Sequence, residues 1–194
     1  MKKLLNRIDG MLVATLFTTL FYSATYPYIH KEIVSNVSDS IIAFNQIINF
    51  ISIIICSTIW NKLSDRLFKS YPIFCILEAV LNAGLATWTI FTHNILAYYI
   101  IDTLVFATVT RNICCGGVKL RAIRYKTEKA REHFDNNINT MAAIATIVGS
   151  FIAMLLDLDF NMMLILGTIG NCIDNIFYIC IFYSSENRRR QRSS

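Results

Sequence analysis

Four ionisable side chains lie inside long apolar runs of this sequence: Glu78, Asp102, Arg111 and Asp174. Lipid cannot solvate a charge, so such residues in a membrane helix face a bundle interior, a water-filled cavity or a partner group. Their usual chemistry there is the binding and release of protons, ions or charged solutes. The four residues are therefore candidates for a substrate or ion pathway. For Glu78 a purely structural role, as a protonated or paired acid, is an equal alternative.

Three amides and one phenol complete the candidate pathway: Asn45, Asn49, Asn171 and Tyr22. Asn45 and Asn49 are one helical turn apart, on a face of the apolar run 41–60 that also carries Ser52 and Cys56. Lipid offers amides no hydrogen bonds, so this face needs an interior or a partner.

A stripe of hydroxyl groups follows one side of the first apolar run, 11–29. Its members recur at helical spacing: Thr15, Thr18, Thr19, Tyr22 and Tyr26. Such a stripe can line a cavity or hold helices together by hydrogen bonds. The sequence does not decide between these two roles.

Motifs of soluble enzymes are absent from the sequence. We find no phosphate-binding loop, dinucleotide fingerprint or nucleophile elbow. The six cysteines all lie in or at the edge of apolar runs, and no Cys/His spacing is typical of a metal site. We expect a protein that is not an enzyme, with packing thiols and with no cofactor and no metal.

The composition is that of a membrane protein. Of the 194 residues, 55% are hydrophobic and only 16% are charged, against about a quarter charged in soluble domains. Apolar runs of about 20 residues are long enough to cross a bilayer as helices. Six such runs occur, at 11–29, 41–60, 71–92, 95–117, 138–156 and 162–183. They predict an all-α polytopic membrane protein, with a six-helix transmembrane domain over 1–184 and a basic tail over 185–194.

The basic residues are distributed asymmetrically. Of 18 Lys and Arg, 16 fall in the amino terminus, two alternate connections and the tail, whereas Lys31 alone lies in the opposite connections. Cytoplasmic connections are the basic ones, so we expect a multi-pass protein of the cell membrane with both termini cytoplasmic. The net charge of +5 is then explained by topology and anionic lipid, and not by nucleic acid.

The connections between the runs differ in character. The polar stretch 60–69 is predicted to be a ten-residue cytoplasmic loop, whereas His93 and Asn94 alone form a tight hairpin between the third and fourth spans. Small residues between 142 and 153 recur at a spacing that lets helices approach closely, which predicts a packing face. Gly167, Gly170, Asn171, Asp174 and Tyr178 share one side of the sixth span.

The stretch Leu63-Ser64-Asp65-Arg66, followed by Lys69, lies between the second and third spans. In sequence and position it resembles the signature loop of the major facilitator superfamily, although Asn61 and Phe68 stand where that family prefers glycine. Arg111, followed by two glycines, is similar to the family's fourth-span pattern with the glycine one position late. An ordinary basic hairpin, with Asp65 capping a helix, is the alternative interpretation.

The resemblance implies the amino-terminal six-helix half of a transporter that moves solute by the rocking of two halves. It also implies that Asp65 and Arg66 form a gate at the cytoplasmic face. The expected function is a half-size, ion-coupled transporter of a small or amphipathic solute. It would act as a parallel homodimer or with a partner membrane subunit. A non-transporting accessory, immunity or assembly protein, or an inactive fragment of a longer transporter, are the other two hypotheses.

Depth in the membrane suggests a partner for Arg111. Counted from Lys119 and Lys69, Arg111 and Glu78 lie about 12 and 13.5 Å from the cytoplasmic edge. Asp174, about 18 Å deep, and Asp102, nearer the outer face, match less well. We therefore expect an ion pair between Arg111 and Glu78.

Overall fold

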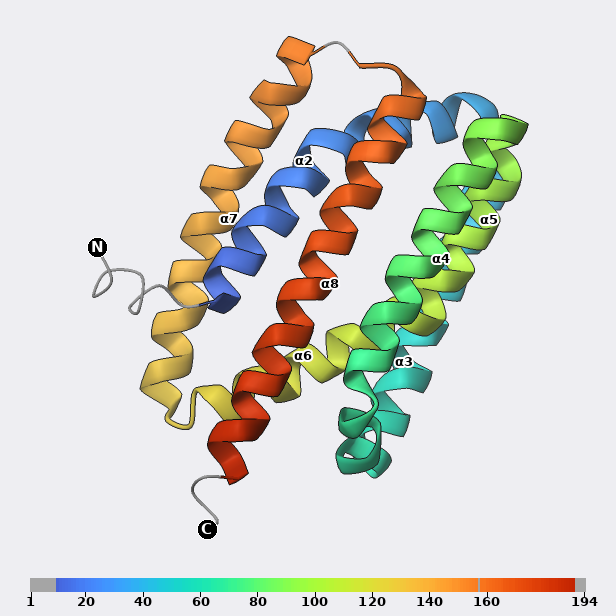
Figure 1. The fold of residues 1–194 in the computed structure, drawn as a ribbon. Coiled ribbons are helices and arrows are strands. Elements are labelled where there is room, and N and C mark those ends of the chain that lie inside the picture. Colours follow the sequence, from blue (N-terminus) through green and yellow to red (C-terminus); the bar gives the residue numbers. More distant parts are fainter. Residues whose placement is uncertain (1–9, 157, 191–194) are drawn as a thin grey trace.

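The computed structural model describes residues 10–156 and 158–190, and this part of the chain folds entirely as helices (Figure 1). They are α2 (Gly10–Asn36), α3 (Asp39–Lys69), α4 (Tyr71–Thr92), α5 (Ile95–Val105), η1 (Phe106–Thr110), α6 (Arg111–Arg124), α7 (Glu128–Leu156) and α8 (Phe160–Arg190). The π-helix η1 joins α5 to α6 without a break, so these three form the fourth of six helical rods. The prediction of an all-α, six-helix protein is confirmed.

Four helices are long and apolar enough to cross a membrane: α3, α4, α7 and the Phe160–Glu186 portion of α8. These four suggest a multi-pass membrane protein. The first and fourth rods, which the sequence also predicted as spans, are not among them. The hydroxyl groups of α2 lower its mean hydropathy, and η1 divides the fourth rod into α-helical pieces of 11 and 14 residues.

The rods pair in a simple pattern (Figure 1). Helix α2 packs against α7 and α8, and α4 packs against α8. The fourth rod packs against α3 and α4. The polar cluster around Glu78, described below, lies where α4, α8 and the fourth rod meet.

The predicted loop at 60–69 is wrong. The helix α3 continues through this stretch to Lys69, with a kink at Leu63 (φ −120°, ψ 21°), and Ser70 alone separates it from α4. Inside the stretch, Trp60 is buried and its indole N–H donates to Asn112 Oδ1 at 2.8 Å. The polar residues therefore form the end of a long helix and not a loop. The predicted hairpin at His93 and Asn94 is confirmed, because α4 ends at Thr92 and α5 begins at Ile95.

Two glycines let the rods approach closely. A Cβ on Gly149 of α7 would lie 2.6 Å from the carbonyl oxygen of Leu20 in α2, so only glycine permits this contact. Gly149 and Ala153 belong to the predicted packing face and are buried, as is Ala145, which the prediction did not include. A Cβ on Gly116 of α6 would lie 2.2 Å from the fully buried ring of Tyr71.

Candidate functional site

The carboxylate of Glu78, in the middle of α4, is the centre of a buried polar cluster. Its side chain is 5% exposed and accepts hydrogen bonds from three neutral donors. The hydroxyl of Thr110 donates to Oε1, while the amides of Asn171 and Asn175 donate to Oε2 at 3.3 and 2.7 Å. Within the described residues it has no cationic partner. Glu78 is thus an acid held only by neutral donors.

Thr110 is the last residue of the π-helix η1. A π-helix widens the turn and leaves backbone groups without their usual partners, and it often marks a functional site. Here the thiol of Cys56 in α3 donates to the carbonyl oxygen of Ala107 in η1, at 3.8 Å. The irregular turn is therefore held by α3 on one side and by Glu78 on the other.

Asn175 is the most deeply buried amide of the cluster, at 2% exposed. Its two N–H groups face three acceptors, Glu78 Oε2 and both oxygens of Asn171, the latter at 3.1 Å. Its own Oδ1 is buried and has no hydrogen-bond partner in the described part of the chain. A half-turn of this amide would present Oδ1 to Glu78, and the Thr110 hydroxyl can likewise accept instead of donate. The cluster can therefore hold either the carboxylate or the carboxylic acid.

Two further acids surround this cluster. Asp174, in α8, accepts a hydrogen bond from the hydroxyl of Thr18 in α2. Asp174 and Asp102 both lie within electrostatic range of Glu78. The side chain of Asp102 makes no hydrogen bond or ion pair with the described residues. Of the predicted pathway residues, Asn171 thus contacts Glu78, whereas Asp102 and Asp174 only lie within electrostatic range of it. No group of Asp, Glu, His and Cys in the described ranges is arranged to hold a metal ion.

The predicted ion pair between Arg111 and Glu78 is not formed. The guanidinium carbon of Arg111 lies 4.7 Å from the ring centroid of Phe106, one turn earlier. Its Nε is buried without a hydrogen-bond partner among residues 10–156 and 158–190. The matching depths were a correct count along two helices, but rotation decides contact. Because Thr110 faces Glu78, its neighbour Arg111 points about 100° away around the helix.

The amides of α3 lie apart from the Glu78 cluster. Asn45 is buried and donates to the hydroxyl of Thr103 in α5 at 3.0 Å, so it has the interior that its sequence position required. Asn49 is half-buried, and its Oδ1 has no partner in the described ranges. Ser52 and Cys56 of the same face are buried.

Tyr22 is 56% exposed and stacks on Tyr26, with 4.5 Å between ring centroids. It therefore lies on the outside of the isolated chain. Of the same hydroxyl stripe, Thr18 binds Asp174 and so joins α2 to α8. The stripe serves helix packing at Thr18, and its role at Tyr22 stays a prediction.

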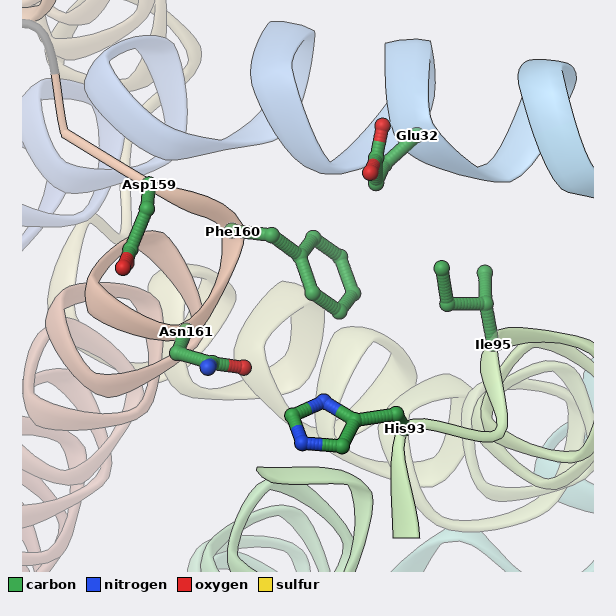
Figure 2. A pocket seen from close by; sticks show the side chains of 6 residues that line it. All are labelled: Glu32, His93, Ile95, Asp159, Phe160 and Asn161. Carbon is green, nitrogen blue, oxygen red and sulfur yellow. The ribbon is translucent and has the colours of Figure 1, made fainter. Parts of the chain in front are cut away.

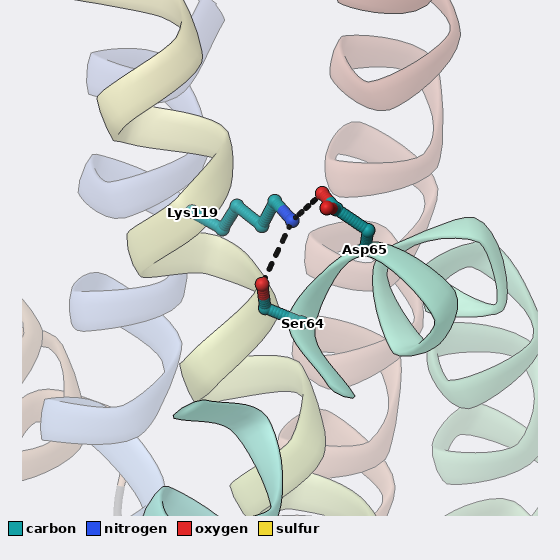
Figure 3. Close-up of polar contacts among 3 residues, drawn as sticks. All are labelled: Ser64, Asp65 and Lys119. Carbon is teal, nitrogen blue, oxygen red and sulfur yellow. Dashed lines mark hydrogen bonds and ion pairs between the residues drawn. The ribbon is translucent and has the colours of Figure 1, made fainter. Parts of the chain in front are cut away.

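The predicted gate residues, Asp65 and Arg66, lie at the opposite end of α3 from Asp39, beyond the kink at Leu63. Figure 3 shows Asp65 beside Ser64 and Lys119. The ammonium group of Lys119, in α6, lies 2.6 Å from Asp65 Oδ1 and 3.2 Å from Ser64 Oγ. Asp65 is 91% exposed. Arg66 is exposed and has no ion pair with the described residues. Asp65 thus ties α3 to the fourth rod within the chain.

Sequence reasoning missed Thr110 and Asn175. Asn175 had a usable signal, because it follows Asn171 by four residues and so continues the polar side of α8. Thr110 had no such signal, because threonine is common in membrane helices and no residue pattern in the sequence indicates a π-helix.

Comparison with known proteins gives no match: no family model, no curated protein and no solved structure corresponds to this chain. The site must therefore be interpreted from its own chemistry.

Proposed function

We propose that this chain is a half-size, ion-coupled membrane transporter that moves a small or amphipathic solute. It works as a parallel homodimer or with a partner membrane subunit. The chain lies in the cell membrane with both termini in the cytoplasm, as its distribution of basic residues predicts.

The observation that carries the proposal is Glu78, a buried acid held by neutral donors alone. An acid at membrane depth is costly, and in transporters such groups take up and release protons. The hydroxyl and amides around Glu78 can serve both protonation states after small rotations. Glu78 is thus suited to exchange a proton, and its contact with η1 can pass that change to the fourth rod.

The pairing of the rods also supports the proposal. If the first three rods are exchanged in order with the last three, the main pairings exchange among themselves. The contact of α2 with α7 becomes that of the fourth rod with α3, and the contact of α2 with α8 becomes that of the fourth rod with α4. The contact of α4 with α8 stays unchanged. Such internal repeats are common among secondary transporters.

The test is solute-dependent proton movement in liposomes. The purified protein is reconstituted around a pH-sensitive dye, and a panel of amphipathic and small charged solutes is added outside. We expect at least one solute to change the internal pH with the natural protein and with Glu128→Gln, an exposed acid of α7, as matched control. Glu78→Gln should abolish the change. Equal responses from Glu78→Gln and the control would contradict the proposal.

The assembly is tested separately by crosslinking. Because the basic residues bias the chain strongly to one orientation, two copies should insert in parallel. Single cysteines near Ser38 and near Asn94, in a chain without native thiols, should crosslink to the same end of a second copy and react with reagents added outside. Efficient crosslinks between Ser38 of one copy and Asp65 of another would contradict a parallel dimer.

A second candidate function is a non-transporting accessory, immunity or assembly protein. The burial of Glu78 favours this function. The residue is 5% exposed and both of its carboxylate oxygens accept hydrogen bonds, so it can simply hold α4, α8 and η1 together. Asp65→Asn separates the two, because a gate residue should be needed for solute movement, whereas a structural hairpin should tolerate the change. An inactive fragment of a longer transporter would show no activity until the missing half is supplied.

A further inference from the structure

A cavity of about 290 Å³ lies at the end of the bundle opposite the Asp65–Lys119 pair. Three separate segments surround it: the last turns of α2, the hairpin between α4 and α5, and the start of α8. Its lining residues are Glu32, His93, Ile95, Asp159, Phe160 and Asn161. Figure 2 shows the ring of Phe160 in the middle of this group, with Glu32 and His93 on either side of it.

The charge around this cavity is negative. Glu32 and Asp159 line it, and Lys31 is the one Lys or Arg that the sequence places in these connections. The carboxylate of Asp159 is fixed, because Oδ1 accepts the backbone N–H of Met162 at 2.8 Å. That of Glu32 is half-buried and makes no hydrogen bond or ion pair within the described ranges. A concave site with one sign of charge concentrates ligands of the opposite sign.

His93 enters the cavity from an unusual backbone. It closes α4 with φ 53° and ψ 25°, the one positive φ among the described residues other than glycine. Glycine is the usual residue at such a helix end, so a histidine accepts a conformational cost there. Because this residue is histidine and not glycine, an imidazole lies on the cavity wall.

An aromatic face completes the wall. The ring of Phe160 is half-buried and meets Tyr98 of α5 edge to face, with 6.4 Å between centroids. Tyr98 therefore fixes the ring against the cavity. An aromatic face beside carboxylates is the usual recognition element for alkylammonium groups. A metal ion fits less well, because the acids and the histidine do not converge on one point.

We propose that this cavity binds a small organic cation, of the alkylammonium class, between Glu32, Phe160 and His93. Glu32 supplies the countercharge, Phe160 supplies an aromatic face, and Asp159 adds a fixed negative charge at the edge. Binding stands on the cavity alone. That the cation is also the transported solute rests on the proposed function.

The experiment uses the full-length protein in nanodiscs, with choline as probe and ligand-observed NMR as readout. The uncharged isostere 3,3-dimethyl-1-butanol tests whether charge is recognised. We expect saturable choline binding and none of the isostere. Glu32→Gln should raise the Kd about tenfold, since loss of the countercharge removes about 1.4 kcal/mol. Phe160→Leu should raise it about fivefold through the lost cation–π contact.

The matched control is Asp39→Asn, an exposed acid at the same end that does not line the cavity. It should leave the Kd within about twofold, because water and salt screen an exposed charge that does not line the cavity. A second variant, His93→Gly, suits the backbone at this position and should fold normally while weakening binding. Unchanged thermal unfolding midpoints of these variants will show that loss of binding is not loss of fold.

Several results would overturn the cation site. They are equal effects of Glu32→Gln and Asp39→Asn, binding of the isostere as tight as that of choline, absence of saturable choline binding, or Ca²⁺ binding that needs Glu32 while choline does not bind. The assay contains no gradient and measures no flux. Choline binding by a protein that shows no proton-coupled uptake of any solute in the panel would therefore contradict the proposed function and leave the cation site intact.

Discussion

Glu78 and Arg111 are opposite charges on neighbouring helices, and they meet opposite surroundings. Glu78 accepts hydrogen bonds from three neutral donors, whereas the buried Nε of Arg111 has no partner in the described part of the chain. The residue just before Arg111, Thr110, is one of the donors to Glu78. The described part of the chain therefore supplies hydrogen-bond partners to the carboxylate of Glu78 but none to Nε of Arg111.

Under the proposed function, this difference has a simple interpretation. A buried acid satisfied within the chain can exchange a proton without a partner. A guanidinium that lies over an exposed Phe106 ring and has no hydrogen bond at Nε invites a group from outside the chain. Under the proposed function, Arg111 would meet a partner subunit or a solute, while Glu78 would serve the coupling ion.

The largest effect is expected when the acid is removed. Glu78→Ala leaves the donors of Thr110 and Asn171 without their acceptor in a buried site, whereas Asn175 keeps the oxygens of Asn171 as acceptors, and each unsatisfied donor costs about 1–3 kcal/mol. We expect the free energy of unfolding, measured in mixed micelles, to fall by about 3 kcal/mol. Glu128→Ala, on the exposed start of α7, should change it by less than about 0.5 kcal/mol. Equal effects of the two would show that the cluster does not stabilise the fold.

A smaller effect is expected when one donor is removed. Thr110→Val keeps the shape of the side chain and deletes the hydroxyl that donates to Oε1 of Glu78. The free energy of unfolding should fall by about 1 kcal/mol. Thr108→Val is the control, because Thr108 lies two residues earlier in the same π-helix and its exposed hydroxyl bonds only backbone oxygens. If Thr108→Val lowers the free energy of unfolding more than Thr110→Val does, this turn stabilises the protein through η1 itself and not through Glu78.

Removing the base should cost less still. Arg111→Met deletes a charge whose Nε is unpartnered and keeps most of the packing, so stability should change by less than about 1 kcal/mol. Combined with Glu78→Ala, the two effects should add within about 0.5 kcal/mol, because the charges do not pair. A coupling of about 2 kcal/mol in this double-mutant cycle would restore the ion pair that the sequence suggested.

The smallest effect on stability is expected at the Asp65–Lys119 pair. The pair is exposed at Asp65, so water and salt screen it, and Asp65→Asn should change the free energy of unfolding by less than about 0.5 kcal/mol. Under the transporter proposal the same variant should abolish solute-dependent proton movement. Normal proton movement in this variant would show that Asp65 is not a gate residue, and it would say nothing about Glu78.

Those structural features that depend on the spacing of apolar residues could be predicted from the sequence. The six helices and the hairpin at His93 and Asn94 follow from spacing alone, and the structure confirms them. The segment 60–69 did not follow, because polarity indicates exposure to water and not the absence of a helix. An apolar helix can continue into a polar segment, as α3 does.

The contacts of the charged residues could not be predicted. Counting residues gives the depth of Glu78 and Arg111, but the rotation of each helix decides which side chains meet. The π-helix η1 shifts that rotation in the middle of the fourth rod, and no residue type in Phe106–Thr110 signals it. Asn175 was within reach of the sequence pattern, whereas Thr110 required the structure.

The most direct test of the account is whether Glu78 exchanges a proton with water. Infrared difference spectra of the protein in nanodiscs, recorded between acidic and alkaline buffer, report carboxyl groups through the C=O stretch of their protonated form. We predict a pH-dependent carboxyl band that is present in the natural protein and in Glu128→Gln and is lost in Glu78→Gln. Identical spectra for Glu78→Gln and the natural protein would show that Glu78 does not titrate, and would contradict its role as the ion-coupling site.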